Sequence, residues 1–124
     1  MKKLVFYKCE VCGNVAVKLV DKGVPMFCCG QKMSEIKPNT VDGAVEKHKP
    51  VFSINGNVVE VKVGQVPHPM SEEHYISHII LQTTTGFSVK TLQPNDQPQA
   101  TFALSGSEKV ETVYSYCNLH GLWS

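Results

Sequence analysis

Residues 51–63 read Val-Phe-Ser-Ile-Asn-Gly-Asn-Val-Val-Glu-Val-Lys-Val, and this stretch indicates the fold class of the chain. Its two runs, 51–54 and 58–63, are rich in the β-branched and aromatic residues that strands favour. Between them, Asn55-Gly56 is a strong signal for a tight hairpin turn. The stretch therefore predicts two antiparallel strands.

Similar runs follow toward the C-terminus and extend the prediction from one hairpin to a whole domain. Turn residues such as Thr85-Gly86 and Ser105-Gly106-Ser107 separate them, and a polar, proline-bearing loop covers 93–99. A single helical turn near Ser71-Glu72-Glu73 is the one helix expected. Several short strands at this spacing are typical of an all-β sandwich or barrel. The further strands are expected at 75–84, 87–92, 100–104 and 109–116.

The first 37 residues form a separate small unit in this interpretation, and 38–47 connect it to the strand-rich remainder. Strands are expected at 4–8 and 15–20. Apolar side chains are too few for so short a segment to fold on its core alone. Units of this size usually need a metal ion, disulfides or a partner chain.

Four thiols supply the expected metal site of this unit. A Cys-x-x-Cys loop turns two sulfur atoms toward one ion, and four thiolates suit tetrahedral zinc or iron. The second pair is vicinal, which predicts a distorted tetrahedron. The spacing alone does not choose between zinc and iron. The four residues are Cys9, Cys12, Cys28 and Cys29.

Composition limits the class of protein. The chain has 124 residues, of which 42% are hydrophobic and 19% charged, as in a folded globular protein. The formal net charge of +1 argues against a nucleic-acid reader that works through bulk basic charge. No apolar run approaches the roughly 18 residues of a membrane-spanning helix, and the short N-terminal apolar stretch ends before a signal-peptide core could form.

Five cysteines in such a chain predict reduced thiols and a soluble protein of the cytoplasm. A disulfide framework is not expected, because metal ligation or reactive thiols account better for the odd count. Neither a membrane nor a nucleic acid is expected as a partner.

The fifth cysteine belongs to a second candidate metal site, in the strand-rich part. Cys117 and His120 form a Cys-x-x-His pair directly after an expected strand. Three more histidines stand in loops or at strand edges, whereas His78 falls inside a strand and is expected to bind no metal. A single histidine is usually an ordinary residue, but several imidazoles with one thiolate favour iron or copper over magnesium or calcium. The three are His48, His68 and His74.

Together these motifs resemble the desulfoferrodoxin family, superoxide reductases that carry two mononuclear iron centres. The matching stretches occur in the family's order and cover nearly the whole chain. They are 7–14 (Tyr-Lys-Cys-Glu-Val-Cys-Gly-Asn), 28–30 (Cys-Cys-Gly), 39–42 (Asn-Thr-Val-Asp), 46–48 (Glu-Lys-His), 67–70 (Pro-His-Pro-Met), 73–76 (Glu-His-Tyr-Ile) and 117–121 (Cys-Asn-Leu-His-Gly).

The resemblance implies a desulforedoxin-like domain over 1–37, with an Fe(Cys)4 centre, and an immunoglobulin-like antiparallel β-sandwich over 38–124, with an Fe(His)4(Cys) centre. In such proteins the counterpart of His120 binds the iron through Nδ1, and the other histidines bind it through Nε2. The implied activity is one-electron reduction of superoxide to hydrogen peroxide without production of dioxygen. The implied ligands of the second iron are His48, His68, His74 and His120 in the plane and Cys117 on the axis.

The resemblance also implies a homodimer, superoxide as the substrate and rubredoxin as the electron donor. It gives catalytic roles to Glu46 and Lys47, which by themselves are typical of a solvated charged loop. Lys47 would add positive charge that steers the superoxide anion. Glu46 would bind the oxidised iron at its vacant position.

Two other interpretations remain open from the residues alone. In the first, the four-thiolate centre is the working part of a rubredoxin-like electron-transfer or structural metal protein. In the second, the chain is a zinc-binding interaction module without redox chemistry. An open metal position that responds to small anions would distinguish a superoxide reductase from a closed electron carrier.

Overall fold

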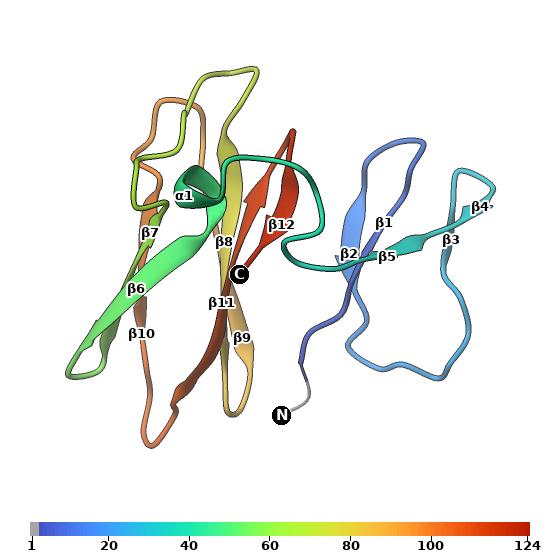
Figure 1. Ribbon diagram of the computed structural model, residues 1–124. Helices are drawn as coiled ribbons and strands as arrows, with labels where there is room; N and C mark the ends of the chain where they lie inside the picture. Colours follow the sequence, from blue (N-terminus) through green and yellow to red (C-terminus); the bar gives the residue numbers. More distant parts are fainter. Residues whose placement is uncertain (1–2) are drawn as a thin grey trace. The chain divides into compact units, whose positions relative to one another are not determined.

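The computed structural model describes residues 3–124, which divide into two compact units. The N-terminal unit ends at Lys37, and the second unit, here called the body, is Pro38–Ser124. Both consist mostly of short strands, coloured blue to teal in the N-terminal unit and green to red in the body (Figure 1). In the described part of the chain, no helix is both long enough and apolar enough to cross a membrane.

The N-terminal unit contains a three-stranded antiparallel sheet and a small hairpin. In the sheet, β1 (Phe6–Lys8) lies between β2 (Val15–Val17) and β5 (Ser34–Ile36). The hairpin pairs β3 (Phe27–Cys28) with β4 (Gln31–Lys32). Such short strands bury few side chains, which makes the interior of this unit small.

The buried hydrophobic residues of the N-terminal unit are Phe6, Cys9 and Met33. Several large apolar side chains are exposed instead, among them Leu19 at 85% and Phe27 at 68%. So little buried apolar area does not offset the conformational entropy lost by the ordered backbone. The fold of this unit therefore depends on its cysteines.

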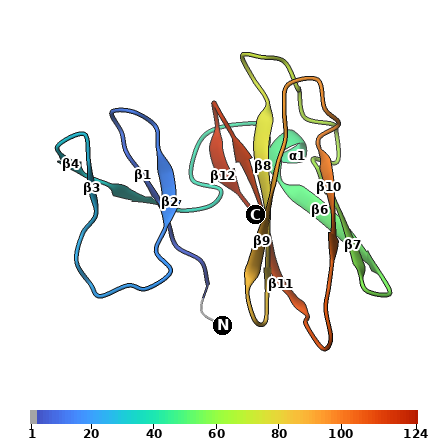
Figure 2. The ribbon, with the colours of Figure 1, turned by 180° about the vertical axis from the view of Figure 1, so that it is seen from behind.

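The body is an antiparallel β-sandwich (Figures 1 and 2). One sheet has the strand order β10-β7-β6 and the other has the order β12-β11-β8-β9. Sheets of three and four antiparallel strands have the architecture of an immunoglobulin-like sandwich, which confirms the expected fold class. The strands are β6 (Pro50–Asn55), β7 (Val58–Val63), β8 (Ile76–Thr83), β9 (Phe87–Thr91), β10 (Gln99–Ala103), β11 (Val110–Cys117) and β12 (Gly121–Trp123).

The core of the body lies between the two sheets. Every second residue of β7 is buried, because successive side chains of a strand point to opposite faces. β8, which β11 and β9 flank, is buried over most of its length. The core includes Cys117, so a candidate metal donor is anchored among buried, packed side chains. The core residues are Val59, Val61, Val63, Ile76, Ile79, Leu81, Phe102, Val113 and Cys117.

The hairpin predicted around Asn55-Gly56 is confirmed. β6 and β7 pair in an unbroken register that ends at Asn55 and Val58. Gly56 has a φ of 63°, in the left-handed region that a tight hairpin turn requires. β8, β9, β10 and β11 lie within one residue of their expected bounds at either end, whereas no strand was expected at the position of β12.

The expected helical turn at 71–73 is wrong. Ser71 and His74 exchange backbone hydrogen bonds of 3.0 and 3.3 Å, and these close a bend instead of a helix. The helix of the described chain is α1 (Val45–His48), inside the segment expected to be a connector. Because α1 is four residues long and has no side-chain N-cap bond, no sequence signal marked it.

Glu108 ties two turns of the body together, and its environment predicts acid sensitivity. Its carboxylate accepts hydrogen bonds from the hydroxyls of Thr83 (2.6 Å) and Thr85 (2.9 Å) and from the backbone N–H of Ser105 (2.9 Å). The hydroxyl of Thr83 is the main reason why the pKa of Glu108 falls from 4.5 to about 2. A carboxyl whose pKa is lower in the folded state stabilises the fold above its unfolded pKa and loses this effect as the pH falls.

We therefore expect the thermal midpoint of the body to fall as the pH is lowered from 4.5 to about 2, and expect Glu108→Gln to weaken this dependence. Thermal melts across this interval measure it, with Glu111→Gln as the matched control on the adjoining strand. Equal pH dependence in wild type and Glu108→Gln would contradict the assignment.

Candidate metal centres

Four thiols converge in the N-terminal unit. The sulfur atoms of Cys9, Cys12, Cys28 and Cys29 all lie within 4.8 Å of one another. The Sγ atoms of Cys12 and Cys28 are 3.6 Å apart. Four sulfurs bound tetrahedrally to one ion at about 2.3 Å would stand about 3.8 Å apart, so the cluster has the size of a single metal site.

The loop that carries the first two cysteines is a closed turn. The N–H of Gly13 donates to the carbonyl of Cys9, and the N–H of Cys9 donates to the carbonyl of Asn14, both at 2.9 Å. These bonds hold the sulfur atoms of Cys9 and Cys12 on one side of the loop. The side-chain amide of Asn14 also donates to Cys28 Sγ at 3.7 Å.

The vicinal pair reaches the same site through an unusual backbone conformation. Cys29 has a φ of 52°, in the left-handed region, and Gly30 follows at 72°. A non-glycine residue in this region costs on the order of 1–3 kcal/mol. Such strain beside two sulfur donors is what adjacent cysteines need in order to turn toward one ion.

Hydrogen bonds separate the pKa values of the thiols. The backbone N–H of Cys12, 3.5 Å from Cys9 Sγ, is the main cause that lowers the pKa of Cys9 to about 6. Hydrogen bonding with the thiol of Cys12 raises the pKa of Cys28 and raises that of Cys29 to about 12. Four thiolates cannot share this volume without a cation, so a metal ion would bind with release of protons.

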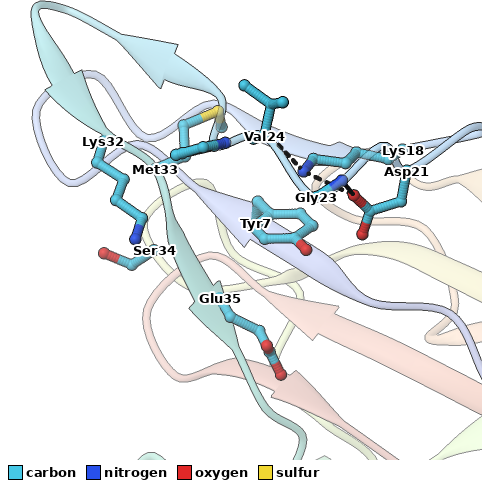
Figure 3. Close-up of a pocket in the computed structure, with 10 residues that line it drawn as sticks. Tyr7, Lys18, Asp21, Gly23, Val24, Lys32, Met33, Ser34 and Glu35 are labelled. Carbon is cyan, nitrogen blue, oxygen red and sulfur yellow. Dashed lines mark hydrogen bonds and ion pairs between the residues drawn. The ribbon is translucent and has the colours of Figure 1, made fainter.

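The N-terminal unit also contains a hollow of about 530 Å³, separate from its cysteines (Figure 3). The ammonium of Lys18 in its wall donates to Asp21 Oδ1 at 3.2 Å and to the carbonyl of Val24 at 2.7 Å. It also lies 5.2 Å from the centre of the Tyr7 ring. Lys18 thus holds the loop around the hollow in place, a role in folding.

In the body, five donors from separate segments meet. His48 ends α1, His68 and His74 lie between β7 and β8, Cys117 ends β11, and His120 lies in the turn before β12. The donor atoms of His48, His74, Cys117 and His120 are within 4.8 Å of one another. The ring of His68 lies beside the rings of His48 and His74, with centroids 4.5 and 4.6 Å away.

The four imidazoles form a closed ring of neighbours. After His68 and His74 comes His120, whose ring centroid is 4.9 Å from that of His74. The centroids of His120 and His48 are 4.7 Å apart and close the ring. Across the ring, His48 and His74 are 6.0 Å apart. Neighbouring ring planes are steeply inclined, by 71° to 86°. Four neighbours that close on themselves, with a longer separation across the group, can surround a single ion.

Hydrogen bonds fix which ring nitrogen is available. Nδ1 of His48 is 2.7 Å from the carbonyl of Ala44, and Nδ1 of His68 is 2.6 Å from the carbonyl of Pro69. A carbonyl only accepts, so each Nδ1 carries the proton and each Nε2 keeps its lone pair.

Two Nε2 atoms of the group have no hydrogen-bond partner. Nε2 of His68 and Nε2 of His74 are buried, and within residues 3–124 neither has a hydrogen bond. Unsatisfied buried nitrogen atoms are costly and rare in folded proteins. Their presence in a ring of imidazoles is evidence that the donor set fits a metal ion.

His120 faces the group with its Nδ1 atom, whereas His48 and His68 have Nε2 available. Its Nδ1 is 3.0 Å from Nε2 of His48 and 3.8 Å from Sγ of Cys117. The thiol of Cys117 therefore lies next to the imidazole ring, and it supplies the one donor of the group that can be negatively charged.

Burial favours the neutral form of three of the imidazoles. It lowers the pKa of His68 to about 4 and lowers the pKa values of His48 and His74 as well. Burial raises the pKa of Cys117, opposed by the backbone N–H groups of His120 and Leu119. Neutral imidazoles are ready to bind a cation, and a cation would in turn stabilise the thiolate of Cys117.

Backbone hydrogen bonds join the loop that carries His68 to α1. The N–H of Val66 donates to the carbonyl of Glu46 at 3.1 Å, and the N–H of Gly64 donates to that of Lys49 at 3.0 Å. Gly64 has a φ of 87°, and a Cβ there would collide with the carbonyl oxygens of Val66 and Lys47. Only glycine lets the loop approach α1 this closely.

Two residues that the sequence did not single out support the ring. Trp123 stacks on His48 with centroids 5.0 Å apart, and its Nε1–H donates to the carbonyl of His120 at 3.0 Å. The hydroxyl of Ser115 donates to the carbonyl of His48 at 2.8 Å. No local motif marks either residue, because each acts across strands.

The remaining candidates lie around the group. His78 is in β8, where its Nδ1 is hydrogen-bonded with the hydroxyl of Ser77 at 2.8 Å, and it is outside the donor group. Lys47 is half-buried. Desolvation is the main cause that lowers the pKa values of His48 and His74, and the positive charge of Lys47 lowers them further. Glu46 is exposed and borders a separate hollow of about 410 Å³.

Comparisons with known proteins agree with this geometry. The family profile of desulfoferrodoxin matches residues 40–124, and that of the desulfoferrodoxin N-terminal domain matches residues 2–36. A desulfoferrodoxin of Syntrophotalea carbinolica is 45% identical over 124 residues, which span 99% of this chain and 96% of the relative.

Solved structures show the same likeness. The superoxide reductase of Treponema pallidum has a TM-score of 0.82 and 37% identity, with 98% of each chain covered. The one-iron superoxide reductase of Giardia intestinalis has a TM-score of 0.54 and 35% identity, and the match covers 63% of this chain and 93% of that one. The four-cysteine group and the histidine–cysteine group match the two iron centres of the desulfoferrodoxins. On its matching profiles and this identity over its whole length, the chain belongs to the desulfoferrodoxin family.

Proposed function

We propose that this chain is a superoxide reductase, which reduces superoxide by one electron to hydrogen peroxide without forming dioxygen. The ring of four imidazoles with Cys117 beside it is the observation that carries the proposal. Four nitrogens and one thiolate suit Fe²⁺ and leave the sixth position of an octahedral ion free for a small ligand. The solved relatives from Treponema pallidum and Giardia intestinalis, both named superoxide reductases, support it.

We assign the ligands residue by residue. The N-terminal iron would be held by the sulfur atoms of Cys9, Cys12, Cys28 and Cys29. The iron of the body would be held by Nε2 of His48, His68 and His74, by Nδ1 of His120 and by Sγ of Cys117. The unpartnered Nε2 atoms of His68 and His74 support the assignment of those two rings.

The charges of the body site suit a small anion. When bound, ferrous iron supplies the electron that superoxide takes up, and two protons complete hydrogen peroxide. Cys117 provides the only charged donor, so the site with Fe²⁺ carries a net charge of about +1. Lys47, adjacent to His48, adds a positive charge that attracts superoxide toward the group.

Glu46 has a different proposed role, as an anionic oxygen ligand of the oxidised iron. Carboxylate oxygen is a hard donor and prefers the higher charge of the ferric ion. Glu46 lies two residues before His48 in α1, and its exposed side chain is free of the core packing that would hold it in one rotamer. We therefore expect Glu46→Ala to change the spectrum of the oxidised protein and to leave that of the reduced protein as it is.

A small anion tests the proposed open position. Azide added to the iron-loaded protein should perturb the absorption of the body's centre and leave the bands of the four-cysteine centre in place. A closed electron carrier would show no response at either centre. An unchanged spectrum at saturating azide would favour the rubredoxin-like alternative.

Lys47 provides a test of electrostatic capture. Lys47→Ala should slow the second-order reaction with superoxide about tenfold at low ionic strength and flatten its salt dependence, because steering by charge is screened by salt. Stopped-flow or pulse-radiolysis rates measure this, with iron content as a check. Lys49→Ala, an exposed lysine two residues further on, is the matched control. Rates unchanged from wild type at low salt would contradict the role.

The setting of the protein follows as part of the proposal. None of the five cysteines forms a disulfide within residues 3–124, and unpaired cysteines persist in a reducing compartment, which supports the cytoplasm. Rubredoxin as electron donor and a homodimeric assembly are proposed on the family resemblance alone.

A further inference from the structure

The rings of the body site differ in what holds them. His48 and His68 each donate a hydrogen bond from Nδ1 to a carbonyl, and His48 also stacks on Trp123. For His74, no hydrogen bond to either ring nitrogen is found within residues 3–124. The position of this ring therefore depends on the backbone segment that carries it, residues 73–75.

Two side chains hold that segment. The hydroxyl of Ser71 accepts from the N–H of His74 at 3.2 Å and donates to its carbonyl at 3.3 Å, and Asn118 holds the residues on either side. The side-chain carbonyl of Asn118 accepts from the N–H of Tyr75 at 2.9 Å, and its amide donates to the carbonyl of Glu73 at 3.0 Å. The backbone N–H of Asn118 donates to the carbonyl of Tyr75 at 3.2 Å. These three bonds grip the chain on both sides of His74.

Asn118 lies where the strand ladder ends. The register between β8 and β11 shifts between Tyr116 and Cys117. The pair of Cys117 with Ile76 is the last one of the ladder. One residue further, the amide of Asn118 offers one donor and one acceptor, the same pair that a peptide group offers to a neighbouring strand. The Asn118 side chain thus continues the hydrogen bonding of β8 with β11 past the register shift. It joins residues 73–75 to the turn between Cys117 and His120.

We propose that Asn118 is a positioning residue of the body's metal site. It holds the ring of His74 in its place within the group of four imidazoles. The proposal rests on the ligand assignment made above. Asn118 is exposed, so water can replace its bonds when it is removed, and the free energy of folding should change little. The loss should appear instead in the metal site, because ligands that are not held in orientation bind less tightly.

The test compares Asn118→Ala and Asn118→Asp with Asn57→Ala. Asn57 is an exposed asparagine in the turn between β6 and β7, which makes the same replacement there a matched control. Iron-loaded proteins are challenged with a ferrous chelator. The emission of Trp123, the one tryptophan of the chain, follows the loss of metal from the site because its ring stacks on His48. The thiolate-to-iron absorption of the body is recorded as a second readout.

We expect Asn118→Ala to weaken iron binding in the body about 10- to 100-fold and to shift the absorption band, whereas Asn57→Ala leaves both unchanged. Asn118→Asp should fall between them, because it keeps the acceptor for Tyr75 and loses the donor to Glu73. Metal-free Asn118→Ala should melt at the temperature of the wild type.

Two results would overturn the proposal. One is iron retention and absorption in Asn118→Ala equal to those of Asn57→Ala. The other is a metal-free Asn118→Ala that melts well below wild type, which would assign the residue to folding instead. A wild type that holds iron but leaves superoxide untouched would refute the proposed function and not the role of Asn118, so the two failures are distinguishable.

Discussion

Cys117→Ser is expected to abolish superoxide reduction while the four-cysteine centre keeps its iron. Cys117 is fully buried at the end of β11 and is the one donor of the body that can carry a negative charge. A serine hydroxyl of nearly the same size stays protonated at neutral pH, so the site would keep four neutral imidazoles and lose its anion. Loss of a direct ligand should cost more than the roughly 100-fold that loss of an outer partner costs.

The measurement for this variant is the rate of superoxide consumption, together with iron content and thermal melting. Cys12→Ser, the same substitution at the other centre, is the matched control. It should retain the reaction of the pre-reduced body with superoxide. Superoxide reduction by Cys117→Ser within a few-fold of the wild-type rate would show that the histidine–cysteine group is not the working site.

Removal of metal from the N-terminal unit is expected to unfold that unit and leave the body folded. Among residues 3–37 the buried hydrophobic side chains are only those of Phe6, Cys9 and Met33, while the body has its own core between two sheets. Structural ions bound by several thiolates contribute about 10–16 kcal/mol in small zinc domains, as much as the whole stability of an ordinary domain. Cys12→Ser should have the same effect, because it leaves three thiols.

Amide hydrogen exchange resolves the two units. Residues up to Lys37 should lose protection in Cys12→Ser and in the chelated wild type, while β7, β8 and β11 keep theirs. The affinity for metal should fall as the pH is lowered, since protons compete for sulfur atoms such as that of Cys9, whose pKa is about 6. Full protection of the N-terminal unit without metal would contradict this dependence on the ion.

Much of the architecture could be predicted because it is encoded locally. Asn55-Gly56 between two β-branched runs specifies a hairpin by itself, and the Cys9-x-x-Cys12 loop brings two sulfurs together within one turn. β3, β4, β5 and β12 escaped prediction because strands of two or three residues carry too little periodicity to be recognised. α1 escaped because its residues are held by a loop that Gly64 brings close.

The body's donor group could be predicted only in part. Loop placement and the Cys-x-x-His spacing pointed to Cys117 and His120, but their meeting with His48 depends on the packing of two sheets. Ser115, Asn118 and Trp123 act through hydrogen bonds to residues 43 or more positions away, or through the turn itself. Tertiary contacts of this kind leave no pattern in a single sequence.

The most direct test of the central proposal is the yield of hydrogen peroxide for each superoxide consumed by the reduced protein with both centres filled with iron. We predict one peroxide for every superoxide, oxidation of the body's iron and no dioxygen. One peroxide for every two superoxides, with release of dioxygen, would identify dismutation. That result, or no consumption of superoxide at all, would contradict the account.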